Sequence, residues 1–197
     1  MIPEQTALIL VGYQNDYFAR DGILRGVVEE PGRVDEVLRN TMALIDKLAP
    51  TAAAIISTPI VLEQDYRALA SPVGILHAIK ESGAFAVGTK GAETIPELLA
   101  FGDRIVYVAG KVGFNGFANT ELDQVLRAKG IKHVMLAGMV TSLCIDSTGR
   151  AAYERGYHVT VLSDCTSART QTEQDFFCNN VFTLYGSVQA GSHLSLN

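Results

Sequence analysis

The sequence predicts a three-layer α/β/α sandwich, in which helices cover both faces of a mostly parallel, six-stranded, Rossmann-like sheet. Short, unbroken apolar runs, typical of strands buried on both faces, recur along the chain. Segments with apolar residues at helical spacing separate these runs, an alternation that favours parallel strands joined by helices. Because the 197 residues contain no internal repeat or linker, we expect one domain over residues 1–197.

Each expected strand is a short apolar run followed by turn-forming residues. Gly12 ends the first run, and residues 12–16 form its exit loop. Gly138 breaks the fourth run, residues 163–165 leave the fifth, and the last strand is short, as expected at a sheet edge. In chain order, the strands are expected at residues 6–11, 52–57, 104–109, 133–137, 158–162 and 187–190.

Each expected helix has apolar residues three and four positions apart. Val34 and Val37 begin this pattern in the first helix, and Gly130 and Gly156 close two later ones. The second helix lies within residues 58–91, a Pro- and Gly-containing stretch that is a candidate lid or partner surface. In chain order, the helices are expected at residues 32–48, 74–81, 94–100, 120–130, 144–156 and 172–184.

Composition argues against several classes of partner. The chain carries 16 Lys and Arg against 21 Asp and Glu, a net charge of -5, and no basic patch, so we expect binding to neither nucleic acid nor anionic membranes. No apolar run approaches the ~20 residues of a membrane span, and the first strand begins too early for a signal peptide. Three widely spaced cysteines in such a chain favour a reducing, cytoplasmic location.

Cys144 is the main candidate for chemistry. It follows an expected strand and opens an expected helix, where backbone N–H groups and the helix dipole favour a thiolate and can form part of an oxyanion site. The alternative is that Cys144 is a small residue buried for packing, which is common for free cysteine.

Three polar segments are expected to meet near Cys144. Residues 12–16, Lys111 and residues 140–144 all follow expected strands, and ligands of open parallel sheets gather outside these carboxyl ends. An ammonium group beside a thiol favours the thiolate, whereas the alternative for Lys111 is a solvated surface residue. The glycine- and aromatic-rich residues 112–117 suit a small-molecule pocket wall and lack a nucleotide-binding pattern.

Four segments, in order and at similar spacing, resemble the isochorismatase-like, or cysteine, hydrolases over nearly the whole chain. Residues 8–18, Leu-Ile-Leu-Val-Gly-Tyr-Gln-Asn-Asp-Tyr-Phe, resemble an opening strand with the signature Asp-x-Gln-Asn-Asp-Phe. The other three segments contain the following matching residues: Lys111, Phe114, Phe117, Asn119, Thr120 and Leu122; Gly138, Thr141, Cys144, Thr148, Ala152 and Gly156; Asp164, Ser167 and Ala168.

The resemblance implies a hydrolase of small amides or related carbonyl compounds, with Cys144 as nucleophile and Lys111 as its electrostatic partner. It also implies a cis peptide between Met139 and Val140, which directs the N–H groups of Val140 and Cys144 into an oxyanion hole. A homo-oligomer, dimer or tetramer, is implied as well. We expect a fairly apolar substrate pocket, lined by Tyr13, Phe18, Phe114, Phe117 and Leu143.

The chain departs from the resembled pattern at Gly12, where the family places a catalytic aspartate. That carboxylate takes the thiol proton and later protonates the leaving group, and glycine can do neither. Asp16 is a possible substitute, although its family counterpart is regarded as structural. Tyr13, Asp21, Glu63 and Asp65 are weaker candidates.

A second departure concerns metal. Residues 57–61 lack the Asp-x-His ligands that nicotinamidases carry after the second strand, the four histidines are scattered, and Cys165 and Cys178 lack metal-ligand spacing. We therefore expect no metal or other cofactor. Besides a hydrolase with an unusual or missing base, two alternatives stay open: a former enzyme that binds a metabolite or protein, and another reaction of the Cys144 thiolate.

Overall fold

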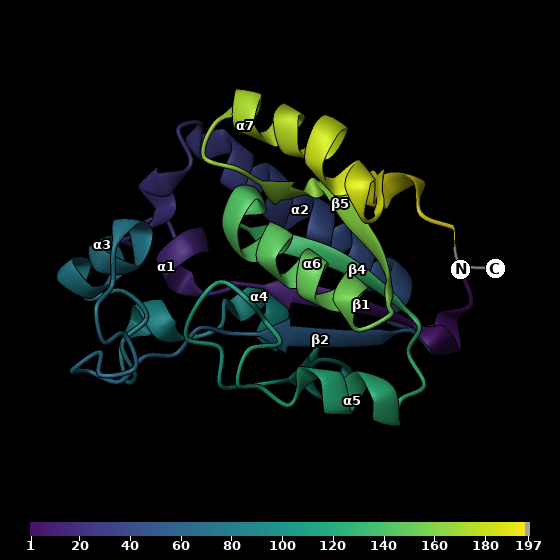
Figure 1. Cartoon of the computed structure of the whole chain (residues 1–197), viewed down its shortest axis with the longest axis horizontal. Helices are drawn as coiled ribbons and strands as arrows, with labels where there is room; N and C mark the ends of the chain where they lie inside the picture. Colours follow the sequence, from purple (N-terminus) through teal and green to yellow (C-terminus); the bar gives the residue numbers. More distant parts are fainter. Residues whose placement is uncertain (196–197) are drawn as a thin grey trace.

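The computed structural model of the protein describes residues 1–195, which form one parallel sheet between layers of helices (Figure 1). The sheet order is β3-β2-β1-β4-β5-β6 and all neighbouring strands are parallel, which confirms the predicted fold class. The strands are β1 (Thr6–Val11), β2 (Ala54–Thr58), β3 (Val106–Tyr107), β4 (His133–Met139), β5 (His158–Ser167) and β6 (Ser187–Gln189).

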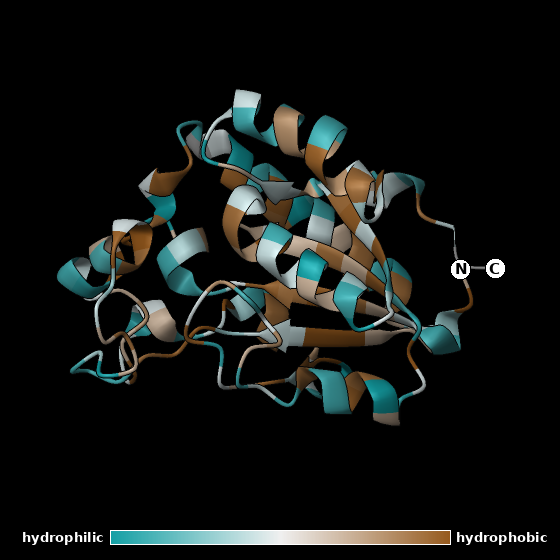
Figure 2. Cartoon of the chain, in the orientation of Figure 1, coloured by the Kyte–Doolittle hydropathy of each residue, from teal (hydrophilic) through white to brown (hydrophobic). Residues whose placement is uncertain are grey.

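The helices divide between the two faces of the sheet. Alternate residues of β1 point to opposite sides: Leu8 and Leu10 pack on the α2 side, and Ile9 packs on the side of α5 and α6. Figure 2 accordingly shows apolar strands between helices of mixed hydropathy. The helices are α1 (Asn15–Phe18), α2 (Pro31–Leu48), α3 (Gly74–Ser82), α4 (Pro96–Leu99), α5 (Leu122–Ala128), α6 (Asp146–Glu154) and α7 (Gln171–Phe176). No helix in the described range is long and apolar enough to span a membrane.

Two predicted strand ends were wrong. Gly138 does not break β4, because its φ of 124° lets the strand continue to Met139 while pairing with Val11 and Thr166. Residues 163–165 do not leave the sheet either. They form an irregularity inside β5, where the register with β4 shifts between Leu136 and Gly138.

Smaller differences concern the ends and lengths of other elements. The predicted third strand shrinks to two residues and the predicted 94–100 helix to one turn, while α1 begins within the predicted exit loop of β1. The predicted last helix divides into α7, a π-helical turn at Phe177–Val181 and a 3-10 turn at Phe182–Leu184. Such endings depend on tertiary contacts more than on local apolar spacing.

Strand order determines where the candidate residues meet. Between β1 and β4 the order reverses, and the two strands end side by side, with Val11 opposite Gly138. The segments that begin at Gly12 and Val140 therefore leave the sheet next to each other. This is the switch point at which open α/β sheets bind ligands.

We expect Gly138→Ala to be severely destabilising, because a Cβ at this position would lie 1.9 Å from the Val11 carbonyl oxygen. The free energy of unfolding in urea should fall by at least about 3 kcal/mol, since two backbones of the sheet must separate. Gly26→Ala is the matched control, because nothing lies within 4 Å of its Cβ position. Equal stability of the two variants would contradict the close packing of β1 against β4.

Candidate active site

Cys144 lies in a π-helical turn, Thr141–Ile145, between β4 and α6. The helix predicted to open at Cys144 instead begins at Asp146, so the thiol belongs to the wider turn that precedes α6. The Cys144 side chain is buried, and the peptide bond between Met139 and Val140 is cis, as the resemblance implies. The turn thus brings the backbone of Val140 and Cys144 to the C-terminal end of β4.

Lys111 is buried beside this turn. Its Nζ lies 3.6 Å from Cys144 Sγ and also donates to the carbonyl oxygen of Gly113. Burial lowers the pKa of Lys111, and the neighbouring Cys144 opposes that shift. The lysine is therefore a partner of the thiol with a reduced tendency to hold its proton, rather than the solvated surface residue of the alternative interpretation.

The segment that carries Lys111 must cross the ends of other strands to reach Cys144, because β2 and β1 separate β3 from β4. Lys111 forms an isolated parallel bridge with Ile60, and the buried side chain of Gln14 bonds both the N–H and the carbonyl oxygen of Ile60. Farther along, Thr148 Oγ1 of α6 accepts from the Gly116 N–H at 3.0 Å. These contacts fix the lysine over the switch point.

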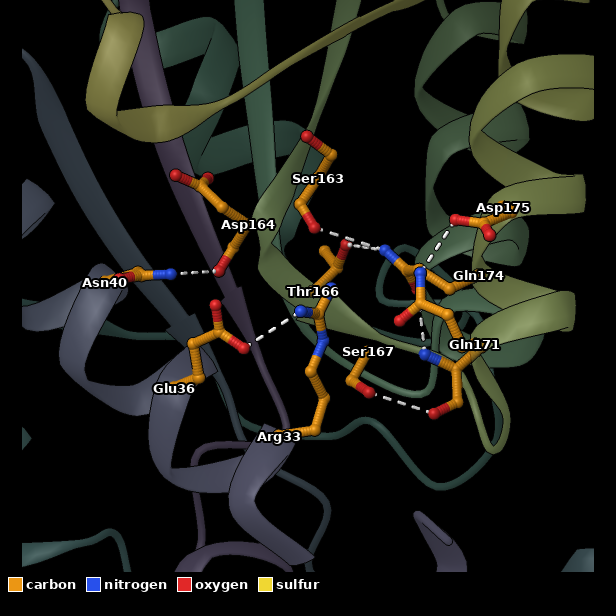
Figure 3. A network of polar contacts seen from close by, with 11 residues as sticks. Arg33, Glu36, Asn40, Ser163, Asp164, Thr166, Ser167, Gln171, Gln174 and Asp175 are labelled. Atoms are coloured by element: carbon orange, nitrogen blue, oxygen red, sulfur yellow. Dashed lines mark hydrogen bonds and ion pairs between the residues drawn. The ribbon is translucent and has the colours of Figure 1, made fainter. Parts of the chain in front are cut away.

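Gln174 of α7 supports the turn Thr141–Ile145, which carries the candidate nucleophile (the nucleophile turn), from the other side. Its Oε1 accepts from Thr141 Oγ1 at 2.7 Å and from the Ala168 N–H at 2.9 Å. Its Nε2 donates to the Ser163 carbonyl oxygen and to Thr166 Oγ1, both on β5 (Figure 3). Sequence reasoning missed this residue, because a glutamine within an amphipathic helix carries no local sign of a buried role.

A small apolar pocket lies over Cys144. The predicted lid helix at residues 74–81 corresponds to α3 and supplies one of its walls. Phe114 and Leu143 line the pocket, as expected from the sequence. The complete lining is Tyr17, Ile60, Leu62, Ile75, Leu76, Ile79, Val112, Gly113, Phe114, Leu143 and Cys144.

The prediction that Tyr13, Phe18 and Phe117 line this pocket needs correction. Tyr13 stacks on Phe18 with ring centroids 4.7 Å apart, in the core on the α2 side, and its hydroxyl bonds Thr41 Oγ1. Phe117 packs on the opposite face of the sheet with Tyr157. The aromatic residues were assigned from their nearness in sequence to the strand ends, which does not determine the face to which a side chain points.

Asp16 is engaged elsewhere and does not contact the thiol. Its Oδ2 accepts from the Phe85 N–H at 2.7 Å, and a Cβ at Gly91 would lie 2.2 Å from its Oδ1. The buried carboxylate thus holds the loops around β1 together. Among residues 1–195, no carboxylate forms a hydrogen bond with Cys144 Sγ, whose one such contact is with Lys111.

The weaker candidates also lie away from the thiol. Asp21 pairs with Lys90 and Glu63 with Arg67 at the surface, and Asp65 is exposed. No group of three or more His, Cys, Asp or Glu side chains within the described residues is arranged to hold a metal ion.

Tyr17 is a polar residue of the pocket lining that sequence reasoning missed. A Cβ at Gly12 would lie 3.2 Å from Tyr17 Cε2 and 3.3 Å from Cδ2, so the tyrosine ring occupies the space beside Gly12. The available signal was the tyrosine itself, which stands where the resembled signature ends in phenylalanine. The chain therefore lacks a carboxylate at position 12 and has a phenol next to the same space.

The isochorismatase domain model matches residues 6–192. The chain belongs to the isochorismatase family. A relative from Pantoea ananatis, named as the ureidoacrylate amidohydrolase RutB, is 30% identical over 97% of this chain and 81% of its own length. The prediction of an isochorismatase-like hydrolase is thereby confirmed at the level of the family.

Solved structures of the isochorismatase family share the fold. A cysteine hydrolase from Pseudomonas syringae pv. phaseolicola 1448A superposes with a TM-score of 0.82 at 23% identity, covering 98% of this chain and 91% of that one. An N-carbamoylsarcosine amidase from Thermoplasma acidophilum has a TM-score of 0.76 at 20% identity, with 97% and 99% coverage. At these identities, the likeness supports the architecture and leaves the substrate open.

We expect Gln174→Leu to loosen the nucleophile turn, because Thr141 and the Ala168 N–H lose a buried acceptor. The free energy of unfolding should fall by about 2 to 4 kcal/mol. Gln171→Leu is the matched control, since Gln171 is exposed on the same helix and bonds Asp175 (Figure 3). Similar losses in the two variants, measured by urea denaturation, would contradict the supporting role of Gln174.

Proposed function

We propose that the protein hydrolyses the C–N bond of a small, apolar amide, with Cys144 as nucleophile and Lys111 as the group that takes its proton. The observation that carries this proposal is the 3.6 Å contact between Lys111 Nζ and Cys144 Sγ beneath an apolar pocket. The family and the amidohydrolase name of the Pantoea ananatis relative support a C–N bond as the target.

The proposed reaction has two steps, with the N–H groups of Val140 and Cys144 stabilising the oxyanion in both. As the thiol proton passes to the neutral amine of Lys111, the sulfur bonds the carbonyl carbon. The C–N bond then breaks as Lys111 returns this proton to the leaving nitrogen. In the second step, water attacks the thioester, Lys111 carries its proton, and the C–S bond breaks to regenerate the thiol.

The pocket supports an uncharged acyl group as the substrate class. The side chains that line it are aliphatic or aromatic, apart from the Cys144 thiol and the Tyr17 hydroxyl. Arg67, which precedes α3 in the chain, is exposed and pairs with Glu63. An anionic substrate would lose its hydration in this pocket without gaining an ion pair, which is unfavourable.

We expect wild-type protein to release ammonia from at least one member of a panel of aliphatic primary amides, such as butanamide and hexanamide. Cys144→Ala should abolish turnover, and Lys111→Met should lower kcat about 10²- to 10⁴-fold, because the thiol loses its proton acceptor. Cys178→Ala is the matched control, since this half-buried thiol lies outside the pocket.

The main alternative, a former enzyme that binds a metabolite, is supported by Gly12 and by the engagement of Asp16 with Phe85. It predicts binding of the same amides, detectable by calorimetry, without ammonia release. It also predicts similar rates of iodoacetamide labelling at Cys144 in wild type and Lys111→Met. Together these results would contradict the hydrolase proposal.

The pH profile tests the role of Lys111. Since burial lowers its pKa, the neutral amine forms at lower pH than in a solvated lysine. We therefore expect kcat/KM to rise with pH and to level off below about pH 10.4, the ordinary lysine value. Among the described residues, the titratable group that acts on Lys111 is Cys144.

Lys111→Arg should remove the rise of kcat/KM with pH, because a guanidinium group does not titrate in this range. An unchanged rise of kcat/KM with pH in the arginine variant would show that another group takes the proton.

The homo-oligomeric state and the cytoplasmic location inferred from the sequence stay predictions, and sedimentation velocity tests the first of them.

A further inference from the structure

Tyr17 is a buried residue of the pocket whose hydroxyl has no assigned task. Its side chain is 2% exposed and lines the pocket together with Cys144, and it is held from behind by Phe85, whose ring centroid lies 5.2 Å away. None of the hydrogen bonds found within residues 1–195 uses the Tyr17 hydroxyl. A hydroxyl in a ligand pocket that has no protein partner is available to the ligand.

The backbone that leaves β1 at Gly12 fixes the position of Tyr17. Gly12 has a φ of 75°, and its missing side chain leaves the space against which the Cε2 edge of the Tyr17 ring packs. A larger residue at position 12 would press on this edge at 3.2 Å. The edge of the Tyr17 ring thus packs closely beside the space that Gly12 leaves open.

The environment allows the Tyr17 hydroxyl to act as a hydrogen-bond donor. Burial, the Cys144 thiol and the Asp16 carboxylate, in that order, raise the pKa of Tyr17 well above its ordinary value of 10.0. The hydroxyl therefore keeps its proton at neutral pH and cannot serve as the base that ionises Cys144. Tyr17 and Cys144 line the same pocket, so a substrate bound over the thiol lies beside the tyrosine.

We propose that Tyr17 is a catalytic residue whose hydroxyl donates a hydrogen bond to the leaving nitrogen of the amide. This inference rests on the hydrolase function proposed above. As the C–N bond breaks, the hydroxyl proton passes along this hydrogen bond to the nitrogen, and the Tyr17 oxygen takes the proton that Lys111 received from the thiol, so that Tyr17 ends the step neutral and protonated. Two residues thereby share the proton delivery and the hydrogen bonding that cleavage of an amide requires.

The test compares two substrates with the same acyl group and different leaving groups. For hexanamide, we expect Tyr17→Phe to lower kcat about 10- to 100-fold, because the nitrogen leaves poorly without a donor. For p-nitrophenyl hexanoate, kcat should change by less than about twofold, since p-nitrophenolate leaves without help. A merely structural role for the hydroxyl would lower both rates by the same factor.

The variant keeps the ring that packs against Gly12 and Phe85, so we expect Tyr17→Phe to unfold at the same temperature as wild type or slightly higher. Tyr13→Phe is the matched control: its buried hydroxyl bonds Thr41 on the α2 side, and its loss should leave the amide-to-ester ratio unchanged. An unchanged ratio in Tyr17→Phe, with an active wild type, would overturn the role of Tyr17 and leave the proposed function intact. Failure of the wild type to cleave either compound would overturn both.

Discussion

The candidate site depends on one buried contact, between the Lys111 amine and the Cys144 sulfur. A buried amine is costly unless it is well partnered, and the partners of Lys111 are this sulfur and the Gly113 carbonyl oxygen. The contact requires the segment after β3 to cross the ends of β2 and β1. This crossing explains the isolated bridge between Lys111 and Ile60, and the two hydrogen bonds by which Gln14 holds the Ile60 backbone. On the other side, Gln174 holds Thr141 of the nucleophile turn against β5.

The second constraint is the close approach at the end of β1. Gly12 and Gly138 both have positive φ, and the space beside Gly12 is filled by the ring of Tyr17. A substitution such as Gly12→Asp therefore does more than add a carboxylate, because it also places a side chain in a left-handed conformation and against this ring. Under the proposed mechanism, the site uses a different arrangement of proton-handling groups rather than the family arrangement with one residue deleted.

Much of the fold was predictable, because burial in a parallel sheet leaves a strong local pattern. Apolar runs predict the central strands, and helical spacing predicts α2. Cys144 and Lys111 were predicted as site residues because each follows the carboxyl end of an expected strand. The irregularity in β5 and the passage of β4 through Gly138 were not predictable, since both depend on pairing between strands. Likewise, the sequence does not reveal which face Phe117 or Phe18 points to, or that Gln174 is buried beneath the nucleophile turn.

The most direct test of the account is to identify the covalent intermediate. The protein would be mixed with p-nitrophenyl hexanoate, quenched with acid after increasing times, and digested for mass spectrometry. The account predicts a hexanoyl group on the Cys144 peptide that forms and then decays in the wild type, and that is absent from Cys144→Ala. Hydrolysis without this adduct, or with the acyl group on another residue, would contradict Cys144 as the nucleophile.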